Sequence, residues 1–175
     1  MKCRKIDNIS FIVDEMLGRT ARWLRILGFD TEWAGELRKN NEALDIDTRI
    51  IYVALMQNRI LITRDKQLAQ RAERYGVQTI ILPTNMNLLD RLTYIVCKIK
   101  EYGVSSLPCI SRCPLCNGEL LQIDKSYVKK RVPLGTYQKH KEFWICARCG
   151  KIYWKGSHWS NIDVIKKVLS KNLEG

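Results

Sequence analysis

The sequence predicts an α/β domain built on a parallel sheet flanked by helices, followed by a small cysteine-bound module and a short terminal helix. Short apolar segments alternate with amphipathic helical segments through residues 1–105, and this alternation is typical of a parallel sheet with helices on both faces. Two Cys-x-x-Cys pairs then follow within residues 106–175. We therefore expect one ordinary domain and one small appended unit in this chain of 175 residues.

The first strand and helix of the α/β domain are predicted by an apolar run and a glycine. Residues 9–13 (ISFIV) indicate a short buried strand that ends at Asp14. Residues 17–27 have apolar side chains at helical spacing, and Gly28 is a natural helix stop. Residues 31–34 predict a second short strand.

The second half of the domain repeats the same alternation. Asp47 is placed to cap a helix that contains Ile50, Ile51, Ala54 and Leu55. Residues 59–63 (RILIT) predict a third strand, and a helix through Leu68, Ala69 and Ala72 follows Asp65. Residues 77–82 predict a fourth strand, and residues 88–99 form a longer amphipathic helix.

The junction between the two units contains Ser105, Ser106 and Pro108. The cysteine-bound module spans roughly residues 109–159. Ser160 is then expected to cap the terminal helix, with Asp163 as its capping-box partner.

The cysteine pairs predict a structural zinc site. Cys113/Cys116 and Cys146/Cys149 are separated by 29 residues, the arrangement of a four-thiolate zinc ribbon. Each pair is followed closely by a glycine, Gly118 or Gly150, which we expect to supply the positive φ of a tight turn. Disulfides or a redox pair are the alternatives, and two matched Cys-x-x-Cys turns argue against both. Four thiolates would leave Zn²⁺ no open position for water.

The remaining cysteines have other expected roles. Cys97 lies in an apolar helical pattern and is expected in the core, and Cys109 precedes the first pair without being needed as a ligand. Metal-type spacing favours a reducing compartment over a disulfide framework. With no signal-like or membrane-spanning apolar run, the expectation is a cytoplasmic protein without a membrane partner.

Positive charge is concentrated in the second unit. Residues 1–105 hold 17 Lys/Arg against 13 Asp/Glu, a net of +4, whereas residues 106–175 hold 13 against 5, a net of +8. A basic excess of this size favours a polyanionic partner, with nucleic acid first among them. A basic protein without such a partner is the alternative.

Three acidic residues are predicted to converge at one edge of the sheet. Asp14 ends the first strand and Asp65 follows the third, while Asp47 opens the helix after the second. In parallel sheets, ligands bind beyond the carboxyl ends of the strands. Clustered carboxylates resist ionising together unless a cation neutralises them, and Mg²⁺ or Mn²⁺ is the cation such oxygens suit. A site of this kind can activate water for phosphodiester hydrolysis.

Each acid also has a structural interpretation. Asp47 and Asp65 could simply cap the helices that they precede. Asp45 and Glu42 compete with Asp47 for the middle position, and Glu15 is an outside candidate beside Asp14.

Other phosphate chemistries lack their motifs. The sequence has no GxxxxGK[ST] loop and no DxD after the first strand. No lysine follows the fourth strand, as a phospho-receiver domain would require. His140 and His158 both belong to the ribbon region, so a histidine-centred site on the α/β domain is not expected.

The segments FIVDEMLGRTARWLRILGFDT, DTRIIYVAL and ILITRDKQLA together resemble PIN-like ribonucleases. The resemblance is to the family named for the C-terminal domain of the nematode Mut-seven protein. In that family a PIN-like domain precedes a zinc ribbon whose end reads much like CARCGKIYWKGSHW here. The similarity extends from about residue 9 to residue 160.

This resemblance implies a PIN-type fold and metal-dependent ribonuclease activity. Asp14 matches the first-strand acid of the family, Asp47 the helix-start acid, and Asp65 the acid of its T-x-D motif. PIN nucleases often have a fourth acid, for which the sequence offers no clear candidate: Asp90 comes late, and Asn85 and Asn87 are uncharged.

Two groups of residues are candidates for RNA contact. On the α/β domain these are arginines near the acids, which could grip phosphates in fork geometry: Arg19, Arg22, Arg25 and Arg64. On the ribbon they are a basic run and a ring pair suited to stacking on unpaired bases: Lys129, Lys130, Arg131, His158 and Trp159. Tyr153 or Trp154 is instead expected in the ribbon core.

The sequence therefore predicts a metal-dependent ribonuclease with a zinc ribbon that assists RNA binding. Its partner is RNA, with transfer and ribosomal RNA as candidate substrates, and no protein partner is indicated. The main alternative is a non-catalytic RNA-binding or ribosome-associated zinc-ribbon protein. A second alternative is a zinc-ribbon module that binds other proteins.

Overall fold

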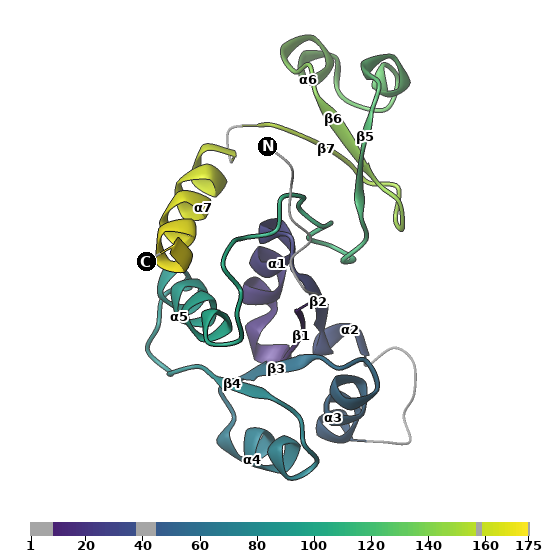
Figure 1. Ribbon diagram of the computed structural model, residues 1–175. Coiled ribbons are helices and arrows are strands. Elements are labelled where there is room, and N and C mark those ends of the chain that lie inside the picture. Colours follow the sequence, from purple (N-terminus) through teal and green to yellow (C-terminus); the bar gives the residue numbers. More distant parts are fainter. Residues whose placement is uncertain (1–8, 38–44, 157–158, 175) are drawn as a thin grey trace.

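A four-stranded parallel sheet forms the centre of the protein in the computed structural model, which describes residues 9–37, 45–156 and 159–174 (Figure 1). The strands are β1 (Ser10–Val13), β2 (Asp30–Trp33), β3 (Ile60–Thr63) and β4 (Thr79–Ile81). Their order in the sheet is β2-β1-β3-β4, and all three pairings are parallel. The α/β fold class predicted from the alternating pattern is confirmed.

Helices cover both faces of this sheet because its central strands are apolar on both sides. Phe11 and Val13 of β1 pack in one core with α1 (Gly18–Leu27) and α5 (Leu88–Lys100). Ile12, between them, points into a second core with α3 (Ile46–Met56) and α4 (Lys66–Arg74). Two short helices, η1 (Glu15–Leu17) and α2 (Ala34–Leu37), complete the connections beside β1 and β2.

The helix ends follow the sequence signals at two places and depart from them at a third. Gly28 ends α1 in a left-handed conformation, and Asp65 caps α4, both as predicted. Asp47 does not cap α3: the cap is Asp45, whose side chain accepts a hydrogen bond from the Thr48 amide. Asp47 is the second residue of α3 and lies in its first turn.

The ribbon is a separate three-stranded antiparallel sheet. It comprises β5 (Leu120–Ile123), β6 (Phe143–Cys146) and β7 (Ile152–Trp154), in the order β5-β6-β7. The long connection between β5 and β6 carries two short helices, η2 (Lys125–Val128) and α6 (Leu134–Lys139). In Figure 1 this sheet projects away from the parallel sheet.

The terminal helix α7 (Trp159–Glu174) returns from the ribbon to the parallel domain. It lies beside α5 (Figure 1), and its Leu169 and Leu173 are buried in the core shared by α1 and α5. The helix has 16 residues, longer than expected, and it begins at Trp159, so the expected Ser160 cap is wrong. No helix in the described ranges is long and apolar enough to cross a membrane.

The two ends of the parallel sheet have different neighbours. Asp14 and Asp65 follow the carboxyl ends of β1 and β3, whereas Asp30 begins β2 at the opposite, amino edge. The chain segment that leads into the ribbon contacts this amino edge, where the Arg112 amide donates to the Arg25 carbonyl over 2.7 Å. The ribbon and the acidic residues therefore lie toward opposite ends of the sheet.

We predict that Gly28→Ala destabilises the protein more than Gly76→Ala does. Both glycines have positive φ, 102° and 85°, so both variants carry the left-handed strain of about 1–2 kcal/mol. A Cβ at Gly28 would also lie 2.5 Å from the Ile110 carbonyl oxygen and 2.6 Å from Pro108 Cβ, whereas one at Gly76 meets nothing within 4 Å. We expect this overpacking to add about 1–3 kcal/mol, measured by equilibrium denaturant unfolding. Equal losses would contradict the close seating of residues 108–110 against the end of α1.

Candidate metal centres and nucleic-acid interface

The four cysteines of the two Cys-x-x-Cys turns meet in one cluster. Their sulfur atoms all lie within 4.8 Å of one another, with Cys113 Sγ 3.8 Å from Cys149 Sγ and Cys116 Sγ 3.4 Å from Cys146 Sγ. Tetrahedral Zn–S bonds of about 2.3 Å require sulfur separations of roughly 3.8 Å. The cluster could therefore hold a zinc ion, as the spacing predicts. The Tyr153 hydroxyl lies 3.1 Å from Cys113 Sγ, and burial together with this contact raises the pKa of Tyr153.

The two turns close in different ways. Gly150 has a φ of 71°, as predicted. In the first turn the residue with positive φ is Asn117, at 64°, and not Gly118. Gly118 is needed for a different reason, because a Cβ there would lie 2.7 Å from Cys146 Sγ. Of the other cysteines, Cys109 is disulfide-bonded and is not a ligand, and Cys97 is exposed on α5 rather than buried as expected.

Thr63 links two of the predicted acids at the carboxyl edge of the sheet. Its hydroxyl donates to Asp14 Oδ2 over 2.6 Å and accepts from the Asp65 amide over 2.9 Å. Asp14 is only 7% exposed and Thr63 is fully buried, so this link is fixed by the core. Asp65 Oδ1 accepts the amides of Gln67 and Leu68, which confirms that Asp65 is also a helix cap.

Asp47 lies within electrostatic reach of the other acids. Burial and then the negative charges of Asp45, Asp65 and Asp14 raise its pKa, with Arg71 acting in the opposite direction. Because the Asp45 side chain is used to cap α3, Asp47 is the acid at the start of this helix whose carboxylate is not used as the cap. Glu42, the other competitor for the middle position, lies outside the described residues.

The chemistry of these acids suits a divalent cation. Asp47 is half-buried among negative charges that disfavour its ionised form, and a bound cation relieves that repulsion. The donors would be carboxylate oxygens of Asp14, Asp47 and Asp65, the ligand type that Mg²⁺ and Mn²⁺ prefer. The three acids do not form a compact group of potential metal ligands; among the described residues only the four cysteines do.

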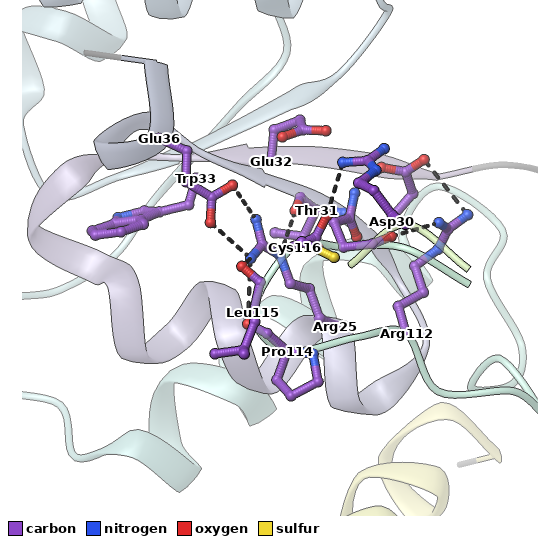
Figure 2. Close-up of polar contacts among 12 residues, drawn as sticks. Arg25, Asp30, Thr31, Glu32, Trp33, Glu36, Arg112, Pro114, Leu115 and Cys116 are labelled. Atoms are coloured by element: carbon purple, nitrogen blue, oxygen red, sulfur yellow. Dashed lines mark hydrogen bonds and ion pairs between the residues drawn. The ribbon is translucent and has the colours of Figure 1, made fainter. Parts of the chain in front are cut away.

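Arg25, predicted to bind RNA, is buried and bonded within the protein. It is 1% exposed, and its guanidinium donates to both carboxylate oxygens of Glu36 over 3.1 Å (Figure 2). The same group donates to the Thr31 carbonyl and to the carbonyls of Pro114 and Leu115 in the first cysteine turn. The interpretation of Arg25 as a phosphate contact is therefore wrong, because its donors are used in joining α1, β2, α2 and the ribbon.

A second polar network beside Arg25 completes this junction. The Asn117 side chain accepts from the Thr31 amide over 3.0 Å and donates to Asp30 Oδ1 over 2.9 Å. Arg59 approaches the same Asp30 carboxylate at 2.6 Å, and Arg112 approaches it at 3.6 Å (Figure 2). Because β2 is an edge strand, no neighbouring strand pairs with its outer side. The side-chain oxygen of Asn117 accepts the hydrogen bond of the Thr31 N–H on that side.

The remaining candidate arginines differ in exposure. Arg19 and Arg22 are exposed on α1 and available for contact. Arg64 is half-buried, and its Nε has no hydrogen-bond partner in the described part of the chain. One of its terminal nitrogens lies 3.4 Å from the Thr84 carbonyl.

On the ribbon, Lys129, Lys130 and Arg131 are all exposed. The Arg131 guanidinium lies 4.1 Å from the centre of the Tyr127 ring and donates to its hydroxyl. Trp159 is half-buried and stacks on Trp144, with ring centres 6.1 Å apart and planes at 8°. His158, its predicted partner, lies outside the described residues.

Sequence reasoning missed residues whose roles depend on tertiary contacts. Arg71 of α4 reaches across to α3, where it donates to the Thr48 hydroxyl over 2.6 Å and pairs with Asp45 at 3.5 Å. It brings a partly exposed cation to the acidic edge. Asn117 joins the two units, but its position inside a cysteine turn marked it only as a turn residue. The T-x-D pattern contained Thr63, yet only the fold shows that it bridges two acids.

The fold and these sites define a parallel α/β protein with an acidic carboxyl edge and an appended four-cysteine ribbon. The model of the Mut7-C RNAse domain family matches residues 9–165, and the chain belongs to that family. The match indicates a function of the ribonuclease type, with RNA as the substrate class. Comparisons with curated proteins and with solved structures give no match.

We predict that Arg25→Lys destabilises the protein by about 2 kcal/mol or more. A lysine ammonium cannot reproduce a bidentate bond to Glu36 together with bonds to three carbonyls. Arg22→Lys, at an exposed position of the same helix, is the control and should change stability by less than about 0.5 kcal/mol. Both are measured by denaturant unfolding of the zinc-loaded protein. A loss for Arg25→Lys no larger than the control would show that this network contributes little.

Proposed function

We propose that this protein hydrolyses RNA phosphodiester bonds at the carboxyl edge of its parallel sheet, with the help of Mg²⁺ or Mn²⁺. The observation that carries the proposal is that Thr63 links Asp14 and Asp65 at this edge, close enough to Asp47 for both charges to raise the pKa of Asp47. Membership of a ribonuclease family supplies the substrate class. The acids as metal ligands and catalytic groups are our assignment.

The side chains around the edge would have different roles in binding the metal and positioning its ligands. Thr63 fixes the Asp14 carboxylate through a 2.6 Å hydrogen bond, so one ligand oxygen is preorganised. Asp65 is anchored as a helix cap through Oδ1. A bound Mg²⁺ or Mn²⁺ would activate water and neutralise charge that develops on the phosphate.

Cationic side chains near the edge would position the RNA backbone. Arg71 of α4 contacts the start of α3 beside the acids, and Arg64 directly precedes Asp65 with an unpartnered Nε among the described residues. Arg19 and Arg22 are exposed on the helix that follows Asp14. Guanidinium groups suit phosphate because they donate in a planar fork.

The zinc ribbon would bind RNA at a distance from the proposed cleavage site. It lies toward the amino edge of the sheet, and a four-residue strand alone spans roughly 13 Å. Its exposed basic run is Lys129, Lys130 and Arg131, with Tyr127 beside Arg131. An RNA strand that contacts both regions would therefore extend along the protein, so the ribbon would contribute binding rather than chemistry.

We predict that Asp14→Asn abolishes Mn²⁺-dependent cleavage of a labelled structured RNA but leaves RNA binding intact. Losing a ligand carboxylate should weaken metal binding by at least about tenfold, since even the partners of ligands cost 10–100-fold when changed. Asp90→Asn is the matched control, because Asp90 is an exposed acid that is not among those acting on Asp47. Manganese should raise the melting temperature of wild type and Asp90→Asn more than that of Asp14→Asn. RNA that binds but stays intact with every metal would favour the non-catalytic alternative.

A further inference from the structure

A cavity of about 530 Å³ lies between the ribbon and the rest of the protein. Its walls come from β6 and β7, from residues 109–114, and from the first half of α7, with Ile26 of α1 contributing as well. This volume falls within the range typical of small-ligand sites. The cavity is separate from the acidic edge, since Asp14, Asp47 and Asp65 are not among its lining residues.

Three of the five tryptophans of the chain line this cavity, Trp144, Trp154 and Trp159. Trp144 and Trp159 are already stacked, with nearly parallel planes. Each of the three is only half-buried. Flat aromatic surfaces at a cavity wall can extend their stack onto a planar ligand, and nucleobases are the planar ligands that proteins most often bind in this way.

The other distinctive lining residues are cationic, namely Arg112, Lys151, Lys155 and Lys166, and the lining contains no acidic residue. Lys155 Nζ lies 5.6 and 5.9 Å from the centres of the Trp144 and Trp159 rings, and its side chain is 46% exposed, so it marks an opening to solvent. Part of this charge is already matched, because Lys155 pairs with Glu142 at 2.8 Å and Arg112 with Asp30 at 3.6 Å.

Lys166 is a half-buried cation in this wall. Burial lowers the pKa of its ammonium group, against the opposing charge of Asp163. Its Nζ makes a long contact of 3.3 Å with the Ser111 hydroxyl. A half-buried ammonium group whose hydrogen bond to Ser111 is long can donate to an anionic oxygen of a ligand.

We infer that this cavity binds one unpaired nucleotide of an RNA strand, with its base against the Trp144–Trp159 stack and its phosphate at Lys155 and Lys166. The inference rests on the proposed function for the identity of the strand. An apolar ligand would leave the half-buried Lys166 ammonium group without a counter-charge, and a small anion would leave the aromatic walls uncovered. A nucleotide satisfies both parts of the lining. The cavity would thus hold RNA away from the carboxyl edge, while cleavage takes place there.

The test follows the five indole N–H signals by NMR, assigned with single Trp→Phe variants of the zinc-loaded protein. The probe is a single-stranded RNA of about 12 nucleotides, within the size range of single-strand sites, added without Mg²⁺ or Mn²⁺. We expect the signals of Trp144, Trp154 and Trp159 to shift, whereas those of Trp23 and Trp33, which do not line the cavity, stay in place. Adenosine monophosphate, added separately, shows whether a free nucleotide suffices.

Substitutions of the lining residues provide a second test, in which RNA affinity is measured. Trp159→Ala should weaken RNA binding by about tenfold or more, as expected for the loss of a stacked base, and Tyr75→Ala, an exposed aromatic elsewhere, should not. Lys166→Ala should weaken binding several-fold, whereas Lys171→Ala, exposed on the same helix, should have little effect. Lys155→Ala serves as a further variant at a partly exposed position, where folding is not at risk.

The outcomes separate this inference from the proposed function. RNA cleavage at the edge with unmoved cavity signals and unchanged affinity of the cavity variants would overturn the inference alone. Shifts confined to the cavity tryptophans, with no cleavage under any metal, would support the inference and contradict the nuclease. Unmoved signals together with no cleavage would overturn both. Shifts with Asp14-dependent cleavage would support both.

Discussion

The buried guanidinium of Arg25 is the interaction on which the arrangement of the two units depends. It bonds at once to Glu36, to the edge strand β2 and to two carbonyls of the first cysteine turn. A buried cation is tolerated only when its hydrogen-bond donors are satisfied. Two of the acceptors here, the carbonyls of Pro114 and Leu115, reach Arg25 only when the cysteine turn is folded. Asn117, in the same turn, completes the edge of β2 through the Thr31 amide. We therefore expect zinc binding at the four cysteines to be coupled to the integrity of the sheet edge.

This junction also sets how the protein could meet RNA. The ribbon is fixed toward the amino edge of the sheet, and the acids lie at the carboxyl edge. The acids are thus gathered where a metal would neutralise their charge, whereas the aromatic and cationic lining of the cavity lies toward the other end of the sheet. The proposed division between RNA cleavage at the acidic edge and RNA binding at the ribbon follows from that separation.

The elements and the metal ligands could be predicted from sequence because their signals are local. Apolar runs, the Gly28 stop and the paired cysteines each act within a few residues, and each prediction is confirmed. The errors arise where tertiary contacts decide. Arg25 belongs to a regular spacing of arginines, and nothing local distinguishes it from the exposed Arg22. Asp45 and Asp47 are both plausible caps in sequence, and only the folded helix start shows that Asp45 is the cap. Asn117 and Thr63 act across long sequence separations, which no local pattern reveals.

The coupling between the cysteine turn and the sheet is tested most directly by amide hydrogen exchange with and without zinc. We expect that removing zinc with a chelator strongly reduces the exchange protection of the Thr31 amide, which donates its hydrogen bond to the Asn117 side chain. The Asp14 amide, bonded to the Ile62 carbonyl in the centre of the sheet, should keep its protection. Unchanged protection at Thr31 after zinc removal would contradict the account, because the edge strand would then not depend on the metal-held turn.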